Sequence, residues 1–289
     1  MSDTTSPYGN NQNPHSRVRI PHLQQMKVLG QKWAMLTAYD MYAASIFEEA
    51  GIPVLLVGDS ASNNVFGHES TLPVTVDELI PLVRAVSRTT RRPLVIADLP
   101  FGSYQATPEQ CFHTAVRFMK EGGAHAVKIE GDMEMLPQAA LLARSGIPVM
   151  AHIGFTPQAE HQLGGYRVQG RGPEANRLIE SARAFEAAGA FALLIEMVPD
   201  EVAAQITAAV SIPTVGIGAG VGCDAQVLVW QDMAGLRTGH LPRFVKQYAD
   251  LRGVLLGAAR DFADDVQAGR FPGPEHAFPL DRAQDKNHR

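Results

Sequence analysis

Acidic side chains end several short apolar runs of this 289-residue chain. Asp59 follows VLLVG, Asp98 follows LVIA, and Glu130 follows AVKI. Carboxylates gathered in one place repel each other strongly unless protons or a cation offset their charge. Because Mg²⁺ prefers oxygen ligands and keeps open positions for water and substrate, the three residues predict a magnesium site. Each aspartate could instead cap the turn or helix that follows it.

A lysine and a histidine accompany these carboxylates. Lys128 and Glu130 are two residues apart, so their side chains point to the same face of a strand. Lys128 is then placed to neutralise a substrate carboxylate while Glu130 touches the metal or one of its waters; the alternative is a structural ion pair. His152 ends VMAH. It could donate to substrate oxygens or orient a water, although a strand histidine is often a satisfied core residue.

Glu196 is the candidate base. It follows the five apolar residues FALLI, so its carboxylate should be partly desolvated, which strengthens it for removal of a proton next to a carbonyl group. Ser60 comes directly after Asp59, and its hydroxyl and N–H could hold a substrate carboxylate oxygen or merely cap a turn. Together these residues favour enolisation of a small 2-oxo acid and formation of a carbon–carbon bond.

The elements that must position these residues repeat along the chain. Amphipathic helices end at glycine and are followed by continuous Val, Ile and Leu runs, which are typical of strands buried on both faces of a parallel sheet. Eight such strands with interleaved helices favour a single-domain α/β fold, the (β/α)₈ TIM barrel, whose working face is the carboxyl end of the strands. The strands are expected near residues 34–38, 54–57, 94–97, 126–129, 149–153, 193–196, 214–217 and 226–230.

Helix signals and composition set the expected boundaries. Asp40 can cap a helix over 41–50, and Thr75 with Glu78 forms a capping box. Residues 21–32 read as an additional N-terminal helix that covers the bottom of the barrel. We therefore expect a disordered N-terminal tail over 1–20, a catalytic barrel over 21–272 and a polar C-terminal tail over 273–289.

The bulk composition excludes several other classes. The net charge is -5 and no block of Lys or Arg occurs, so neither a nucleic acid nor an anionic membrane is an expected partner. No apolar run reaches the roughly 18 residues of a membrane span. The start of the chain lacks the pattern of a signal peptide, and Cys111 and Cys223 cannot build a disulfide framework. These features predict a cytoplasmic protein with inert cysteines.

Several segments resemble the 3-methyl-2-oxobutanoate hydroxymethyltransferase family, also called the ketopantoate hydroxymethyltransferases. GHESTLPVTVDEL at 67–79 and GGYRVQGRG at 164–172 are the most specific, because general barrel physics does not require them. The likeness extends from about residue 20 to 278, with VGCDAQVLVW at 221–230 a loose match. Shorter matching segments are LTAYD (36–40), LLVGDS (55–60), ADLPFGSY (97–104), VKIEG (127–131), HIGFTPQ (152–158) and GHLPRFVKQY (239–248).

The resemblance implies a (β/α)₈ barrel that transfers a hydroxymethyl group from 5,10-methylenetetrahydrofolate to 3-methyl-2-oxobutanoate, giving 2-dehydropantoate in pantothenate biosynthesis. It implies small-molecule partners, a 2-oxo acid and a folate, and a homodecamer. Carried over to this sequence, it assigns Mg²⁺ to Asp59, Asp98 and Glu130, and substrate contacts to Asp59, Ser60, Asp98, Lys128 and, with a looser match, His152. It makes Glu196 the proton acceptor.

Two alternatives are distinguishable from the sequence. One is a magnesium-dependent 2-oxo acid lyase of the phosphoenolpyruvate mutase and isocitrate lyase type, which uses a cysteine in a Lys-Lys-Cys-Gly-His motif. This chain has no such motif, and Cys111 falls in an expected helix. The other is a non-catalytic barrel scaffold, which would be expected to have lost some of the residues at the strand ends. All six candidates, Asp59, Asp98, Lys128, Glu130, His152 and Glu196, are present.

Overall fold

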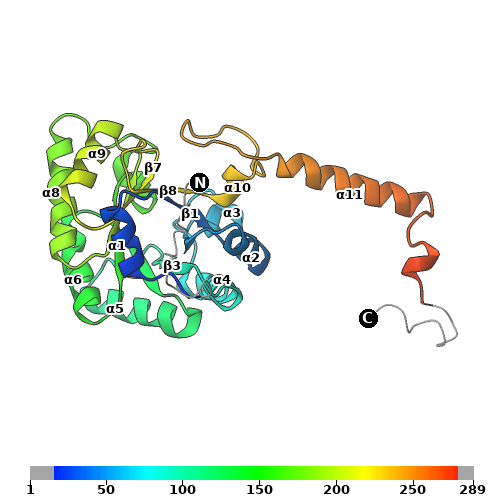
Figure 1. Cartoon of the computed structure of the whole chain (residues 1–289), viewed down its shortest axis with the longest axis horizontal. Helices are drawn as coiled ribbons and strands as arrows, with labels where there is room; N and C mark the ends of the chain where they lie inside the picture. The colour runs from blue at the N-terminus through cyan, green and yellow to red at the C-terminus, as the bar shows by residue number, and fades with distance from the viewer. Residues whose placement is uncertain (1–15, 279–289) are drawn as a thin grey trace, which may run out of the picture. The chain divides into compact units, whose positions relative to one another are not determined.

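Eight parallel strands close into a barrel in a computed structural model that describes residues 16–278 (Figure 1). The strands follow one another around the barrel in chain order, and β1 pairs with β8 to close it. The fold class predicted from the sequence is therefore confirmed. The strands are β1 Trp33–Thr37, β2 Val54–Val57, β3 Leu94–Asp98, β4 Ala126–Glu130, β5 Val149–Gly154, β6 Ala192–Glu196, β7 Thr214–Ile217 and β8 Ala225–Leu228.

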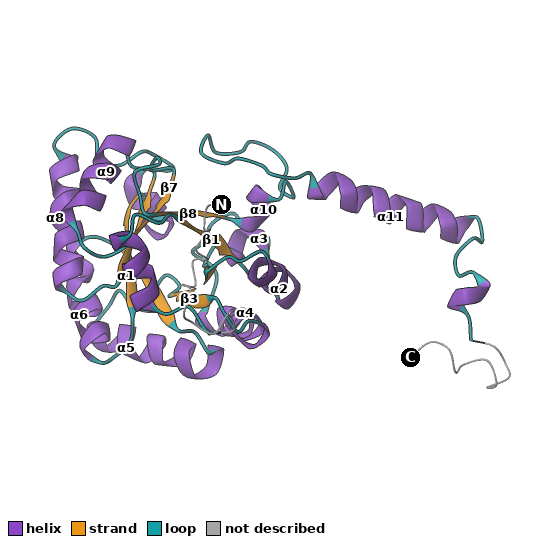
Figure 2. Ribbon diagram, in the orientation of Figure 1, coloured by secondary structure: helices purple, strands orange, loops and turns teal. Residues whose placement is uncertain are grey.

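The strand positions agree with the sequence because burial on both faces imposed the continuous apolar runs. Every residue of β2, β3 and β4 is buried, including Asp98 and Glu130 at the carboxyl ends of β3 and β4. In the unit that contains the barrel, the helices lie outside the strands (Figure 2). They are α1 Ile20–Val28, α2 Met41–Glu49, α3 Ala61–Asn64, α4 Val76–Thr89, α5 Pro108–Arg117, α6 Leu136–Arg144, α7 Glu160–Leu163, α8 Glu174–Ala187, α9 Asp200–Ala209, α10 Trp230–Met233 and α11 Leu251–Gln267. Short turns of other helix types are η1 Phe118–Gly122, η2 Met133–Met135, η3 Pro157–Ala159 and η4 Pro274–His276.

Two of the predicted helix starts are formed by side-chain caps. The Asp40 carboxylate accepts hydrogen bonds from the backbone N–H groups of Tyr42 and Ala43 at the start of α2. Thr75 and Glu78 exchange bonds at the start of α4, where each side chain accepts from the other residue's backbone N–H. Both caps satisfy N–H groups that the helix itself leaves without partners.

The N-terminal helix α1 covers the bottom of the barrel, as the sequence predicted. Its Leu23 and Met26 are buried in one apolar cluster with residues at the amino ends of the strands, among them Leu94, Ala126 and Ala192. A barrel interior is a packed core rather than a pore, and α1 closes that core at the end where the strands begin.

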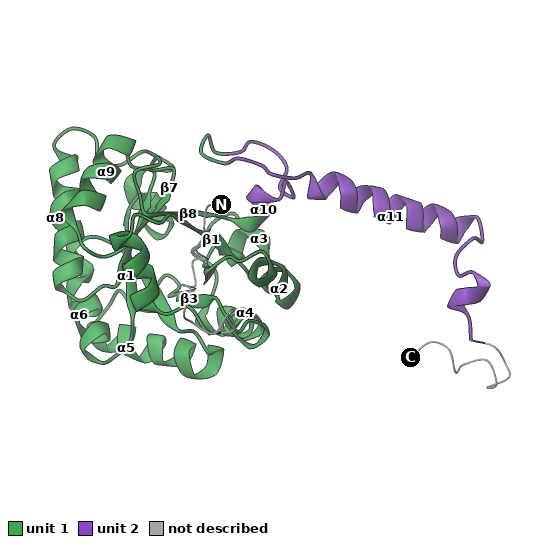
Figure 3. Cartoon of the chain, viewed as in Figure 1, with its two compact units in different colours: residues 1–230, 242–245 green, residues 231–241, 246–289 purple. Residues whose placement is uncertain are grey.

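The described chain divides into two compact units (Figure 3). The first contains the barrel, runs through Trp230 and includes Pro242–Val245; the second includes Gln231–Leu241 and continues from Lys246 through α11. The sequence predicted one barrel domain over 21–272, and these boundaries stay a prediction. Most of the two predicted tails, 1–20 and 273–289, lies outside the described residues. Between residues 16 and 278, no helix combines the length and the apolarity that crossing a bilayer requires.

Candidate active site

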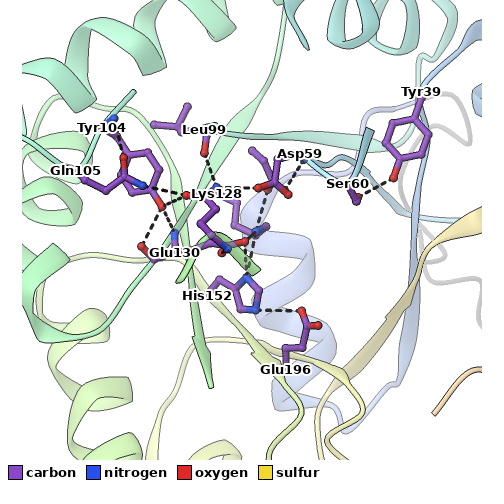
Figure 4. A network of polar contacts seen from close by, with 12 residues as sticks. Tyr39, Asp59, Ser60, Leu99, Tyr104, Gln105, Lys128, Glu130, His152 and Glu196 are labelled. Carbon is purple, nitrogen blue, oxygen red and sulfur yellow. Dashed lines mark hydrogen bonds and ion pairs between the residues drawn. The ribbon is translucent and has the colours of Figure 1, made fainter. Parts of the chain in front are cut away.

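The residues singled out in the sequence lie at the carboxyl ends of five consecutive strands. Asp98 is the last residue of β3, Glu130 of β4 and Glu196 of β6. Asp59 follows β2 by one glycine, and His152 lies near the end of β5. Because neighbouring parallel strands end at the same edge of the barrel, these side chains converge there (Figure 4).

Strand register brings the side chains into contact. Asp98 is the register partner of Lys128 across β3 and β4, and Glu130 is the partner of His152 across β4 and β5. Lys128 Nζ lies 3.1 Å from Asp98 Oδ1 and 3.2 Å from Glu130 Oε1. The lysine side chain is only 3% exposed. Its ammonium group is therefore the buried positive centre among these carboxylates.

His152 joins this cluster to Glu196. Its Nδ1 lies 3.1 Å from Glu130 Oε1, and its Nε2 lies 3.3 Å from Glu196 Oε2. Burial and the nearby Lys128 oppose protonation of the ring. The charge of Glu130 and the hydrogen bonds to both glutamates outweigh them and raise the pKa of His152 to about 9. A protonated imidazole can donate to both glutamates at once.

Burial works against charge on the two aspartates. Desolvation, followed by the negative charges of Glu130 and Asp98, holds the pKa of Asp59 well above its usual range. Desolvation also raises the pKa of Asp98, although the charge of Lys128 opposes the rise. The pKa of Glu130 moves the other way: burial would raise it, but Lys128 and His152 lower it. The cluster thus holds more carboxylates than its cations can stabilise.

The donor chemistry fits a divalent cation. Asp59 and Asp98 are adjacent, since the Asp59 backbone N–H donates to Asp98 Oδ2 at 3.0 Å. A cation would offset the charge that raises the pKa of both aspartates. In the residues from 16 to 278, no three Asp, Glu, His or Cys side chains are arranged to share a metal ion as they stand. Their oxygens contact Lys128, His152 and Gln158 instead.

Ser60 lies at the edge of this cluster. Its Oγ is 2.8 Å from the hydroxyl of Tyr39, and Figure 4 shows the pair beside Asp59 on the side away from His152. Ser60 precedes α3, but its side chain makes no capping bond there. In the structure the hydroxyl contacts Tyr39 instead. A bound substrate carboxylate would compete with that hydroxyl.

Sequence reasoning missed three side chains that contact the cluster. They are Tyr39, Tyr104 and Gln158, all with 7% exposure or less. Each lies in a segment that carried the family resemblance, LTAYD, ADLPFGSY or HIGFTPQ. The signal was therefore available, but these residues lie in loops and turns, beyond the first polar residue that follows each strand.

Comparison with known proteins identifies the family of the chain. The family model described as ketopantoate hydroxymethyltransferase matches residues 17–274. The chain belongs to this family. It is accordingly an enzyme of the transferase class, and the alternative of a non-catalytic scaffold is set aside.

Curated relatives carry the same description along nearly their whole length. A protein of Nocardioides named 3-methyl-2-oxobutanoate hydroxymethyltransferase is 71% identical, with 92% of this chain and 90% of the relative covered. One of Saccharopolyspora erythraea with that name is 63% identical, with 96% and 94% covered. One of Mycobacterium leprae is 59% identical, with 91% and 92% covered.

Solved structures show the fold more broadly. A phosphonopyruvate hydrolase complex with oxalate and Mg²⁺ superposes with a TM-score of 0.59 at 15% identity, covering 89% of this chain and 92% of the other. A 2,3-dimethylmalate lyase of the PEP mutase/isocitrate lyase superfamily gives 0.54 at 18% identity, covering 86% and 98%. At such low identity the likeness shows the barrel fold alone, so the lyase alternative has support only as a distant fold relationship.

Proposed function

We propose that this chain transfers a hydroxymethyl group from 5,10-methylenetetrahydrofolate to 3-methyl-2-oxobutanoate, giving 2-dehydropantoate and tetrahydrofolate in pantothenate biosynthesis. One observation carries the proposal: an unbroken line of contacts from Glu196 through His152, Glu130 and Lys128 to Asp98. It joins a candidate base at one side of the barrel mouth to an acidic cluster that can hold a chelated 2-oxo acid at the other.

The first step is removal of the proton on C3 of the oxo acid. The C3–H bond breaks, the proton passes to the Glu196 carboxylate, and the electron pair forms a C2–C3 double bond as the keto oxygen becomes an enolate. C3 then forms a bond to the methylene carbon of the folate as the bond from that carbon to one folate nitrogen breaks. Water replaces the second carbon–nitrogen bond and supplies the new hydroxyl, while the C3 proton and one proton of the water end on the two nitrogens of tetrahydrofolate. Glu196 is 13% exposed at its side chain, so a substrate at the barrel mouth can reach it.

The remaining residues bind and orient the oxo acid. Asp59, Asp98 and Glu130 would hold Mg²⁺, which when bound supplies electrostatic stabilisation of a developing enolate oxygen. Lys128 offsets the substrate's negative charge, because its pKa is raised by Asp98 and Glu130 against the effect of burial and it stays protonated. Ser60, next to Asp59, would bind a carboxylate oxygen of the substrate.

His152 would orient Glu196 as well as face the substrate. The 3.3 Å contact of its Nε2 with Glu196 Oε2 would hold that carboxylate oxygen and leave the other for the proton of C3. Proton transfer by a positioned side chain typically contributes about 10² to 10⁴ in rate. Orientation of the Glu196 carboxylate would therefore explain why β5 carries a histidine at position 152.

An assay with and without a chelator tests this function. Purified chain is mixed with 3-methyl-2-oxobutanoate and 5,10-methylenetetrahydrofolate, and 2-dehydropantoate is followed by mass spectrometry. We expect product that disappears with EDTA and returns with added Mg²⁺. Parallel incubation with phosphonopyruvate and with 2,3-dimethylmalate tests the lyase class. Cleavage of either compound, without product from the folate reaction, would overturn the proposal.

We also propose that the chain acts in the cytoplasm as a homo-oligomer, a homodecamer as the family resemblance implies. Its two cysteines are free and buried, which is typical of a reducing compartment. In the second unit, α11 carries apolar side chains at Val254, Phe262 and Val266, and a second copy of the chain could cover them. Sedimentation velocity should show a particle of ten 31.2-kDa chains; a monomer at assay concentration would contradict this assignment.

A further inference from the structure

Gln158 contacts two of the buried carboxylates from one point. It lies in the short turn η3 after β5 and is 7% exposed. Its side-chain Nε2 donates to Asp59 Oδ2 at 2.8 Å, and its backbone N–H donates to Glu130 Oε2 at 3.1 Å. A single residue thus holds one oxygen of Asp59, which follows β2, and one oxygen of Glu130, which ends β4.

The Gln158 amide has all its hydrogen-bonding groups satisfied. Besides donating to Asp59, Nε2 donates to the carbonyl oxygen of Leu99 at 3.0 Å. Its Oε1 accepts from the Tyr104 hydroxyl at 2.7 Å and from Gln105 Nε2 at 3.0 Å. An amide has two N–H donors and two acceptor lone pairs, so no freedom remains for it to turn without breaking buried bonds.

Tyr104 determines which way the amide faces. Its hydroxyl accepts a hydrogen bond from the Glu130 backbone N–H at 3.0 Å. Its own proton can be donated to the Glu130 carbonyl oxygen at 3.0 Å or to Gln158 Oε1 at 2.7 Å, and the contact with Gln158 is the shorter. With the carbonyl oxygen turned toward Tyr104, the NH₂ group of Gln158 faces Asp59 and donates to its Oδ2. Tyr104 is fully buried, so water does not compete for these bonds.

We propose that Gln158 is a positioning residue for the metal-binding carboxylates, and that Tyr104 fixes the direction of its amide. This inference rests on the proposed function, because it takes Asp59 and Glu130 as ligands of a divalent cation. By holding one oxygen of each carboxylate, Gln158 limits the rotation of both and leaves the other Asp59 oxygen for a ligand. Partners of metal ligands typically contribute 10-fold to 100-fold in metal affinity.

A purely structural role is the competing explanation, and Gln138 provides a matched control. Gln138 is also a buried glutamine and approaches the backbone oxygens of Tyr104 and Gln105. Within residues 16–278, its hydrogen bonds do not include a carboxylate of the cluster. Replacing either glutamine by methionine keeps a similar side-chain volume and removes the amide, but only at position 158 does the change release Asp59.

The experiment measures Mg²⁺ binding by calorimetry, without substrate, to the full-length chain and to Gln158→Met, Tyr104→Phe and Gln138→Met. We expect about 10-fold to 100-fold weaker binding for Gln158→Met, a smaller loss for Tyr104→Phe, and no more than about a twofold change for Gln138→Met. Circular dichroism and melting temperature compare the folding of all four proteins.

The outcomes separate this inference from the proposed function. If the parent binds Mg²⁺ and Gln158→Met binds it equally well, the positioning role is wrong while the function stands. If Gln138→Met weakens binding as much as Gln158→Met, the effect is structural and the inference is also wrong. If the parent does not bind Mg²⁺, both the inference and the metal-dependent function fail. Should Gln158→Met not fold, unchanged affinity in Tyr104→Phe would overturn the inference.

Discussion

The two ends of strand β4 use polar residues in opposite ways. His125 precedes the strand, and its Nδ1 accepts a hydrogen bond from the Val95 backbone N–H at 3.0 Å. Burial, followed by the charges of Arg17 and Arg19, lowers the pKa of His125 to about 4, so the ring is neutral. At the other end of β4, Lys128 and Glu130 are buried as charges.

The same difference extends around the barrel. At the amino end of the strands, Lys27 pairs with Asp224 at 2.8 Å and also donates to the Thr207 carbonyl oxygen. Arg17 donates to the carbonyl oxygens of Thr90 and Pro93. These side chains at the amino end contact neutral backbone carbonyl groups or a single opposite charge. At the carboxyl end, carboxylates face each other, which costs stability and is typical of sites kept for function.

The largest effect is expected from Glu196→Gln. The variant keeps the size of the side chain but cannot accept the C3 proton, so the rate of solvent exchange at C3 of 3-methyl-2-oxobutanoate should fall by about 10² to 10⁴. Deuterium incorporation measured by NMR checks this. Mg²⁺ binding and melting temperature should stay within error. Glu201→Gln, on the exposed first turn of α9, is the control and should exchange at the parent rate. Exchange at the parent rate in Glu196→Gln would show that Glu196 is not the base.

A change at the amino end should affect stability instead of activity. Leu23→Ala in α1 removes a fully buried side chain from the apolar cluster that closes the barrel. Such deletions typically cost about 2 to 5 kcal/mol, which urea unfolding can measure. The kcat of the remaining folded enzyme should stay near the parent value. A large fall in kcat without loss of stability would contradict the division between the two ends.

A smaller effect is expected from pH. The pKa of His125 is about 4 in the folded chain and roughly 6.5 when unfolded. Between these values the unfolded chain binds more protons, so the free energy of unfolding decreases as the pH falls. Allowing for partial exposure, we expect a loss of about 2 kcal/mol from pH 7 to pH 4.

His125→Asn isolates this contribution, because asparagine can accept the same N–H but does not titrate. The difference between parent and variant in urea unfolding should shrink as the pH falls. The raised pKa of Asp98 acts with the opposite sign in the metal-free chain, since its stabilising contribution is lost as the pH rises. A parent-to-variant difference that is constant with pH would show that His125 does not titrate as described.

Much of the barrel could be predicted from the sequence, because burial on both faces determines the apolar pattern of a strand as well as its place in the sheet. Burial on both faces imposed the apolar runs, and their ends marked Asp98, Glu130 and Glu196 within one residue of the observed strand ends. The caps at Asp40 and Thr75 were also predictable, because they depend on residues only two or three positions apart.

Contacts between distant segments were not predictable in this way. The bond from Gln158 to Asp59 joins residues 99 positions apart, and no periodicity in either segment indicates it. His152 was expected to face the substrate, but its partnership with both Glu130 and Glu196 depends on how β4, β5 and β6 align. The sequence likewise does not say which surface covers α11, in the second unit, because an amphipathic helix pattern does not specify its partner.

The central claim is that the carboxyl end of the barrel holds a divalent cation through its buried aspartates. Thermal unfolding of the parent and of Asp98→Ala, each with and without Mg²⁺, tests it most directly. A ligand at 100 times its dissociation constant stabilises a folded protein by about 2.7 kcal/mol, so Mg²⁺ should raise the melting temperature of the parent and leave that of Asp98→Ala unchanged. An equal shift in both proteins would contradict the claim.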